Sequence, residues 1–287
     1  MYRRISTLSG PVRRLDGGSM FGSLPRSLWS KWFEPDQDNQ IALAARAVLV
    51  QEPGRNVLIL AGAEALLAPL PRGCRCQPQP NGLLERLAVL GLGERDIDVV
   101  ILTHLQAQLP ATLRGAAGEV SLPRLLFPAA RFITGARHWS RARHPHPHDR
   151  ALFVPQLIRE LGDSGRLELL DGADSDVLGA GWRFHFSDGY TPGQLLPEIA
   201  MPAGPVVFAG DLIPGIHWLQ LEVTTAYDRN PEGLIGEKER LLDHLVATRG
   251  RLLFARDPEV ALIKVTRDRR SGYLAFDRQR LLDRLDC

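Results

Sequence analysis

The sequence has few cysteines and no long apolar run. Its three cysteines, Cys74, Cys76 and Cys287, suit neither a disulfide framework nor a C-x-x-C redox or zinc motif. We interpret them as loop thiols and expect a reducing, cytoplasmic compartment. No stretch approaches the roughly 20 apolar residues of a membrane-spanning helix. The basic N-terminal stretch MYRRISTLSGPVRR is not followed by an apolar segment, so we expect neither a signal peptide nor membrane association.

The sequence also has almost no net charge. It contains 35 basic and 33 acidic residues, which give a net charge of +2. A surface for nucleic acid or for an acidic membrane normally needs a clear basic excess. The charge balance therefore offers no argument for such a partner, and we expect none.

The remaining composition is that of a folded protein. The chain has 287 residues, 44% of them apolar, which is enough for a sizeable core. Helix-like and strand-like segments alternate along it without an evident break, which favours one α/β domain over residues 1–287. Residues 45–62 predict a β-hairpin around EPGRN. Residues 81–104 predict a helix capped by Asn81, followed by the apolar strand DVVILTH.

The second half of the chain predicts further elements. Residues 136–150, ARHWSRARHPHPHDR, are basic and proline-containing, and we interpret them as irregular. Helices are expected over 151–165 and over 230–250, the latter with Asn230 as cap and Pro231 at its first position. Strands are expected within 166–172, 182–189, 204–212, 251–260 and 271–277.

Seven motifs then occur in a particular order. They are LDGGSMFGSLPRSLW, DNQIALAARAVLV, VVILTHLQ, DGYTPGQ, VVFAGDL, TAYDRNPE and LLFARDPEV. Together they resemble the metallo-β-lactamase superfamily, in its lactonase-like and organophosphatase-like branch, from about Leu15 to Phe276. The resemblance implies an αββα sandwich, in which two mixed β-sheets lie face to face with helices on the outer faces. Active members of the family hold two metal ions, usually zinc, at one edge of the sandwich.

The family's first metal-binding motif, T-H-x-H-x-D-H, aligns with Thr103–Leu109. Of its ligand positions this chain keeps only His104, while Gln106, Gln108 and Leu109 stand at the others. Glutamine offers a neutral carbonyl oxygen and leucine offers no ligand atom. The resemblance therefore places a metal motif here from which most ligands are missing.

The other ligand motifs show the same pattern. The G-H-T-P-G-H motif has Tyr190 at its ligand position, and the H-D-P motif has Arg256 in place of histidine. The aspartate of an upstream D-T-G motif is replaced by Leu60. The bridging aspartate is present as Asp211. Two retained ligands do not make a tight zinc site, and an arginine cannot lose its charge. We expect no cofactor, and at most one weakly bound metal.

The residues of this former site are the candidate functional residues. His104, Asp211, Tyr190 and Arg256 would supply acid–base and oxyanion groups if any catalysis remains. We expect Arg256 to form an ion pair with Asp211, because a buried carboxylate without its metal ions needs another counter-charge.

Seven further histidines and two glutamines complete the candidates. Gln106, Gln108 and His217 are the candidates for contacting a substrate or ligand. His138, His185 and His244 we interpret as structural or surface residues. The segment 144–148, HPHPH, is interpreted as a solvated loop, because alternating prolines favour an extended chain whose imidazoles splay apart. Whether this loop binds metal stays open.

Two functions follow from these observations. The first is a non-catalytic binding or regulatory module, with a small-molecule ligand in the former active-site pocket and with pairing to itself or to an active relative. The alternative is a hydrolase of a lactone, ester or phosphotriester that uses a residual mononuclear or metal-free site.

Overall fold

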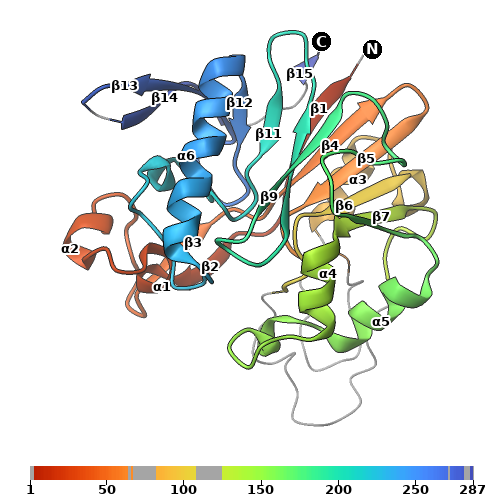
Figure 1. The fold of residues 1–287 in the computed structure, drawn as a ribbon, viewed down its shortest axis with the longest axis horizontal. Coiled ribbons are helices and arrows are strands. Elements are labelled where there is room, and N and C mark those ends of the chain that lie inside the picture. The colour runs from red at the N-terminus through yellow and green to blue at the C-terminus, as the bar shows by residue number, and fades with distance from the viewer. Residues whose placement is uncertain are drawn as a thin grey trace.

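The computed structural model describes residues 3–63, 66, 82–107, 125–270, 272–280 and 285–286. These residues form the expected αββα sandwich: two mixed sheets lie face to face, and helices cover the outer faces (Figure 1). Buried apolar side chains form three layers. One lies between the two sheets, one between the larger sheet and α3–α5, and one between the smaller sheet and α6.

The larger sheet has seven strands in the order β15-β1-β4-β5-β6-β7-β8. The strands on the β15 side are antiparallel, whereas β5, β6, β7 and β8 run parallel. Their bounds are β15 Leu285–Asp286, β1 Arg4–Ser9, β4 Arg46–Glu52, β5 Arg55–Leu60, β6 Val99–Leu102, β7 Arg131–Gly135 and β8 Leu167–Leu170. The continuous apolar sequence of β6 is explained by burial on both faces of the sheet.

The smaller sheet has six strands in the order β14-β13-β12-β11-β10-β9. Only β11 and β12 are parallel neighbours in it. The bounds are β14 Gly272–Gln279, β13 Leu262–Asp268, β12 Arg251–Leu253, β11 Val206–Phe208, β10 Gln194–Ile199 and β9 Trp182–Ser187. A separate two-stranded ribbon pairs β2, Arg13–Asp16, with β3, Gln40–Leu43.

Six α-helices are described. They are α1 Gly17–Phe21, α2 Arg26–Trp29, α3 Gly82–Val89, α4 Ala136–Arg143, α5 Pro155–Asp163 and α6 Pro231–Thr248. The described residues also include the short 3₁₀ helices η2 Glu94–Asp96, η4 Arg150–Leu152 and η5 Ile216–Leu219. As expected, α6 begins with Pro231 at its first position, and the Asn230 side chain accepts a hydrogen bond from the backbone N–H of Gly233 at 3.0 Å.

Three sequence-based expectations need correction or fall outside these residues. Residues 136–150 are not irregular throughout, because α4 occupies Ala136–Arg143 and turns His138 and Ala142 into the interior. Good helix formers, alanine and arginine, outweigh the prolines that follow. The sequence-based expectations contain no counterpart of strands β1, β2, β3, β7, β10, β13 and β15, and Pro197 inside β10 weakens the strand pattern there. The cysteines, Asn81, Gln108 and Leu109 lie outside the described residues.

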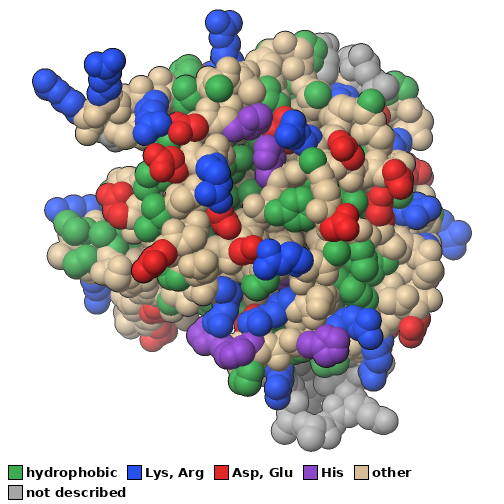
Figure 2. Space-filling model, in the orientation of Figure 1, with side chains coloured by type: hydrophobic (Ala, Val, Ile, Leu, Met, Phe, Trp, Pro, Cys, Tyr) green, Lys and Arg blue, Asp and Glu red, His purple; other side chains and the backbone are tan. Residues whose placement is uncertain are grey.

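The surface carries both signs of charge. On the face drawn in Figure 2, which α6 crosses, basic and acidic side chains are spread among apolar and neutral ones. Among the described helices, none combines the length and the apolar character needed to cross a membrane.

Candidate functional site

The candidate site lies at one edge of the sandwich, where the ends of four strands meet. His104 follows β6 and Asp211 follows β11, while Ala61 follows β5 and Arg256 follows β12. The pairs β5/β6 and β11/β12 are each parallel, so the carboxyl ends of both strands in each pair point to the same edge. Ligand sites of open α/β sheets form at such an edge. The topology therefore gathers residues that are far apart in the sequence.

Arg256 and Asp211 form the expected ion pair. The guanidinium Nε donates to Asp211 Oδ1 at 2.8 Å, and Nη2 donates to Oδ2 at 3.0 Å. The Nε2 atom of His104 lies 2.9 Å from Oδ2 of the same carboxylate. The guanidinium also donates from Nη2 to the Ala61 carbonyl oxygen at 3.1 Å. A two-pronged contact of this kind is a strong form of arginine–carboxylate pairing. The predicted ion pair, with His104 beside it, is confirmed.

The electrostatics of this cluster favour the ionised carboxylate. Burial alone would raise the pKa of Asp211, but the charge of Arg256 and the hydrogen bonds from His104 and Arg256 hold it well below its ordinary value. An ionised carboxylate only accepts hydrogen bonds, so the Nε2 of His104 carries the proton. The Nδ1 of His104 is buried, and no partner for it exists among the described residues.

The backbone around the ion pair is held by further contacts. Arg46 donates from Nη1 to the Phe254 carbonyl at 2.7 Å and from Nη2 to the Asp257 carbonyl at 2.9 Å. The backbone N–H of Arg256 donates to the Pro214 carbonyl at 3.0 Å. These bonds fix the loop that carries Arg256 from both sides. Its guanidinium is therefore presented to Asp211 by a rigid loop.

A glycine permits the turn that carries Asp211. Gly210 has φ of +54°, and a Cβ built on it would lie 2.6 Å from the side-chain Nε2 of Gln194. The positive φ favours glycine at this position, and any larger residue would also have to displace the end of the Gln194 side chain. The Gly-Asp pair of the sequence motif therefore has a steric reason beside any chemical one.

His138 holds the loop that carries His104 through hydrogen bonds. Its Nε2 accepts from the backbone N–H of Leu105 at 2.7 Å, and its Nδ1 donates to the Pro192 carbonyl at 3.1 Å. Complete burial lowers the pKa of His138 to about 3, so the ring is neutral. This histidine links the loop after β6 to the loop that carries Tyr190, whose ring centroid lies 5.3 Å from that of His104. Of the two sequence-based interpretations of His138, structural or surface, its burial excludes the surface position.

The cavity beside the ion pair is nearly filled. Asp211, Arg256, Tyr190 and Tyr227 line it together with Leu15, Met20, Pro214 and Thr225, and its volume is about 10 Å³. That volume corresponds to about one water molecule. Gln106 is buried, and its side-chain oxygen has no partner among the described residues.

His217 lies in a different cavity. Its ring stacks on Trp32, with centroids 4.7 Å apart and planes 9° apart, and burial lowers its pKa. The cavity has a volume of about 520 Å³, and Phe33, Asp257 and Arg278 are among its other lining residues. It shares no lining residue with the small cavity beside Asp211. The volume falls within the range of small-molecule sites, about 300–1,000 Å³.

Comparison with known proteins rests on structure alone. No protein-family model matches the chain, and no curated protein matches its sequence. Among solved structures, a probable metal-dependent hydrolase from Staphylococcus aureus is 24% identical, with a TM-score of 0.76 over 96% of this chain and 97% of that one. AidC, a dizinc quorum-quenching lactonase, is 17% identical, with a TM-score of 0.70 over 96% and 94%. The hydrolase AbOPH of the beta-lactamase superfamily is 16% identical, with a TM-score of 0.66 over the same shares.

The chain has the metallo-β-lactamase fold. The likeness extends over nearly the whole chain, which agrees with the extent of the sequence motifs. At these identities the likeness establishes the fold alone.

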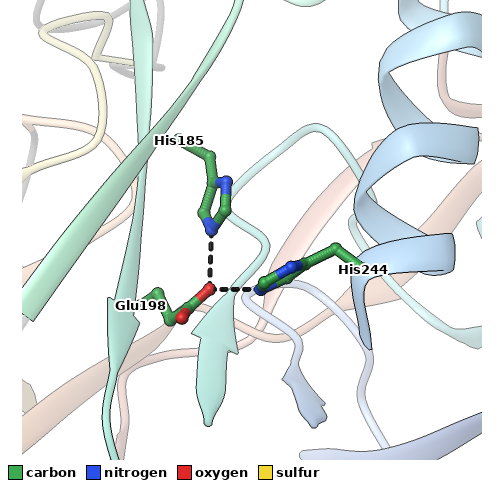
Figure 3. A group of neighbouring side chains, drawn as sticks. All are labelled: His185, Glu198 and His244. Atoms are coloured by element: carbon green, nitrogen blue, oxygen red, sulfur yellow. Dashed lines mark hydrogen bonds and ion pairs between the residues drawn. The ribbon is translucent and has the colours of Figure 1, made fainter. Parts of the chain in front are cut away.

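A second cluster lies on an outer face of this metallo-β-lactamase fold, away from the strand ends. His185 of β9, Glu198 of β10 and His244 of α6 point toward one another (Figure 3). The Nε2 atoms of both histidines lie 2.7 Å from the same oxygen, Oε2 of Glu198. Burial would raise the pKa of Glu198, but the two histidines lower it below its ordinary value. Among the described residues this is the one group of three potential metal ligands that converge.

Sequence reasoning treated the two histidines of this cluster as structural or surface residues. The alternating pattern of β9 does indicate the side on which His185 lies. Trp182 and Phe184 face the core between the sheets, so His185 faces the opposite side of its sheet. The loop with His144, His146 and His148 is exposed, as expected, and its histidines belong to no converging group in the described part of the chain.

Proposed function

We propose that this protein is a non-catalytic binding or regulatory module built on the metallo-β-lactamase fold, in which an ion pair replaces the di-metal centre. The observation that carries the proposal is the two-pronged bond of Arg256 to both carboxylate oxygens of Asp211. A carboxylate that bridges two cations must offer its oxygens to them. Here the same oxygens already bond a fixed positive charge.

The donor set of the edge does not fit a di-metal centre. Such a centre needs several neutral imidazoles and carboxylates around its ions. In the described part of the chain, the Asp211 carboxylate is bonded by one imidazole, that of His104, and by the guanidinium of Arg256. Arg256 cannot be deprotonated in a protein, and its positive charge would repel a metal ion bound to Asp211. No catalytic step through a metal at this edge is therefore proposed.

The guanidinium also supports a structural role in place of metal. It connects Asp211, which follows β11 of the smaller sheet, with Ala61, which follows β5 of the larger sheet. It extends from the loop after β12. One side chain thus connects loops of both sheets at this edge. A metal ion bound at a shared site would stabilise these loops in the same way.

The ligand of such a module is expected in the larger cavity. The cavity beside Asp211 has about 10 Å³, which leaves no room for a small molecule, whereas the cavity that His217 lines has about 520 Å³. The stacked rings of Trp32 and His217 offer a flat aromatic wall. The proposed ligand site is therefore this cavity and not the small one beside Asp211.

The test is a hydrolysis screen on protein purified without a histidine tag. Lactone, aryl ester and phosphotriester substrates are supplied with and without a chelator, and with added Zn²⁺. We expect no turnover above the blank in any condition. Hydrolysis that the chelator abolishes would overturn the proposal, because it would require a working metal centre.

One observation favours the alternative, a metal-free hydrolase. An imidazole held by a buried carboxylate, as His104 is held by Asp211, is an arrangement suited to general acid–base catalysis. In that case hydrolysis would survive the chelator and be lost in His104→Gln, which keeps a donor to Asp211. Absence of turnover in the unmodified protein would exclude this alternative for the substrates tried.

Pairing with a second copy or with an active relative remains a further proposal. Light scattering coupled to gel filtration measures the first case directly, and a mass of one chain at all concentrations would exclude self-pairing.

A further inference from the structure

We propose that His185, Glu198 and His244 form a binding site for one divalent transition-metal ion of the zinc class, which ties α6 to the six-stranded sheet. The site is independent of the strand-end edge and goes beyond the proposed function. Its failure would leave the argument about Arg256 untouched, and metal at the edge would leave this site untouched.

The first support is convergence of three side chains from three different elements. Both imidazoles reach the same carboxylate oxygen, each from Nε2 at 2.7 Å. The two rings have centroids 5.1 Å apart and are tilted by 56°, so they approach the carboxylate from different directions (Figure 3). One ligand atom from each residue lies within 4.8 Å of the others. The three ligand atoms can therefore contact one ion placed between them.

The second support is the rigidity of the elements. His185 and Glu198 are on paired antiparallel strands, where Leu196 is the direct partner of His185. Glu198 therefore lies diagonally across from His185 on the same face of the sheet. His244 comes from α6, whose neighbouring residues Leu241 and Leu245 are buried against this face. The ligand atoms are thus positioned by packed backbone, as preorganised metal sites require.

The chemistry of the donors selects the class of ion. Two imidazole nitrogens and one carboxylate oxygen suit zinc and its transition-metal neighbours, whereas calcium and magnesium prefer oxygen ligands alone. Zinc–ligand bonds of about 2.0–2.2 Å place tetrahedral ligands about 3.4 Å apart. Each histidine Nε2 lies 2.7 Å from Oε2 of Glu198, so each of these two distances has to lengthen by less than about an ångström.

Partial exposure leaves room for a further ligand. The side chains of His185 and His244 are 25% and 29% exposed, and that of Glu198 is 12% exposed. Water can therefore complete the coordination and the ion can enter from solvent. In the metal-free state each Nε2 bears the proton that bonds Glu198. On binding, a neutral imidazole carries its proton on Nδ1 instead and presents the Nε2 lone pair to the ion.

The competing interpretation is a histidine–carboxylate cluster that only stabilises the fold. Calorimetric titration of tag-free, chelator-stripped protein with Zn²⁺ and Co²⁺ separates the two. We expect one ion per chain and a melting temperature that rises with ion concentration. Glu198→Gln and His244→Gln should each weaken binding by more than about tenfold, since loss of even an outer-shell partner typically costs about 10- to 100-fold.

The matched control is the double variant His146→Ala, His148→Ala, which removes exposed histidines from the 144–148 loop. It should bind zinc as the unmodified protein does. The proposal is overturned if the unmodified protein binds no ion, or if Glu198→Gln and His244→Gln bind as well as it does.

Crystals provide a second measurement should a variant fail to fold. Anomalous diffraction from zinc-soaked crystals of the unmodified protein should show a peak enclosed by His185, Glu198 and His244. A peak elsewhere without one here, or no peak, would overturn the proposal.

Discussion

Two histidine–carboxylate clusters in this protein differ in their third member. At the strand-end edge, His104 and Arg256 bond Asp211; on the outer face, His185 and His244 bond Glu198. In both clusters an imidazole Nε2 lies within 2.9 Å of a carboxylate oxygen. The edge cluster is buried, with Arg256 and Asp211 side chains each 7% exposed, whereas the outer histidines are a quarter or more exposed.

The difference teaches how one side chain decides whether a cluster can accept a metal. A guanidinium is permanently charged, bonds both carboxylate oxygens and has no lone pair to offer. An imidazole can give up its hydrogen bond and become a ligand by placing its proton on the other nitrogen. We therefore propose that the edge accepts no metal ion, because titration at ordinary pH does not remove the charge of Arg256. For the outer cluster we propose the opposite, that its imidazoles can become metal ligands.

The largest expected effect is the loss of the edge ion pair. Arg256→Ala should lower the free energy of unfolding by about 3–5 kcal/mol, because Asp211 would remain as a buried charge without its partner. Urea denaturation measures this directly. The control is Arg14→Ala, which removes an exposed ion pair with Asp36 and should cost at most about 1 kcal/mol. Equal effects of the two substitutions would contradict the burial argument.

Arg256→His makes the edge resemble the outer cluster. Without metal it should cost nearly as much as Arg256→Ala, since an imidazole does not bond both oxygens of Asp211. With Zn²⁺ present, part of the loss should return, because two imidazoles and a carboxylate would then face one another. Denaturation with and without Zn²⁺ tests this. Recovery of the same size in Arg256→Ala would show that the new imidazole plays no part.

Acid should lower the free energy of unfolding through the protonation of His138. Its pKa is lowered to about 3 in the folded protein, against an ordinary value of about 6.5. Between these values the unfolded chain binds one more proton at this residue, so stability falls as pH falls below about 6.5. From pH 7 to pH 5 this residue should cost about 2 kcal/mol. His138→Gln, whose side-chain oxygen can still accept from Leu105, should lack this component. Parallel pH profiles for the two proteins would refute the assignment.

The smallest expected effect belongs to the outer cluster without metal. Glu198→Gln keeps an oxygen that can accept from His185 and His244, and the histidines are partly exposed. Its free energy of unfolding in chelator should change by about 1 kcal/mol or less. Denaturation in chelator measures it, and a loss as large as that of Arg256→Ala would mean that both clusters are structural ion pairs of the same kind.

Much of the fold and of the edge could be predicted from the sequence because the signals are local. Pro231 and Asn230 mark the start of α6, and the Gly-Asp turn at Asp211 marks the end of β11. The ion pair was expected from the resemblance to the metallo-β-lactamase superfamily, which implies that the positions of Arg256 and Asp211 approach one centre. Gln108, by contrast, falls outside the described residues, and its assignment stays a prediction.

The outer cluster could not be predicted in the same way. Glu198 is 13 residues from His185 and 46 residues from His244, and no short motif joins them. Their meeting depends on the strand register of β9 with β10 and on the line along which α6 crosses the sheet. The separate cavity of His217 has the same origin, because its stacking on Trp32 depends on how distant segments pack.

The most direct test of the central claim is elemental analysis of tag-free Glu198→Gln protein, in which the outer cluster is disabled. If Arg256 holds the former metal position, this variant should contain far less than one equivalent of zinc, iron or manganese per chain. Its thermal unfolding should be the same with and without a chelator. Two tightly bound metal ions per chain would contradict the account, because they would have to lie at the edge that Arg256 is claimed to close.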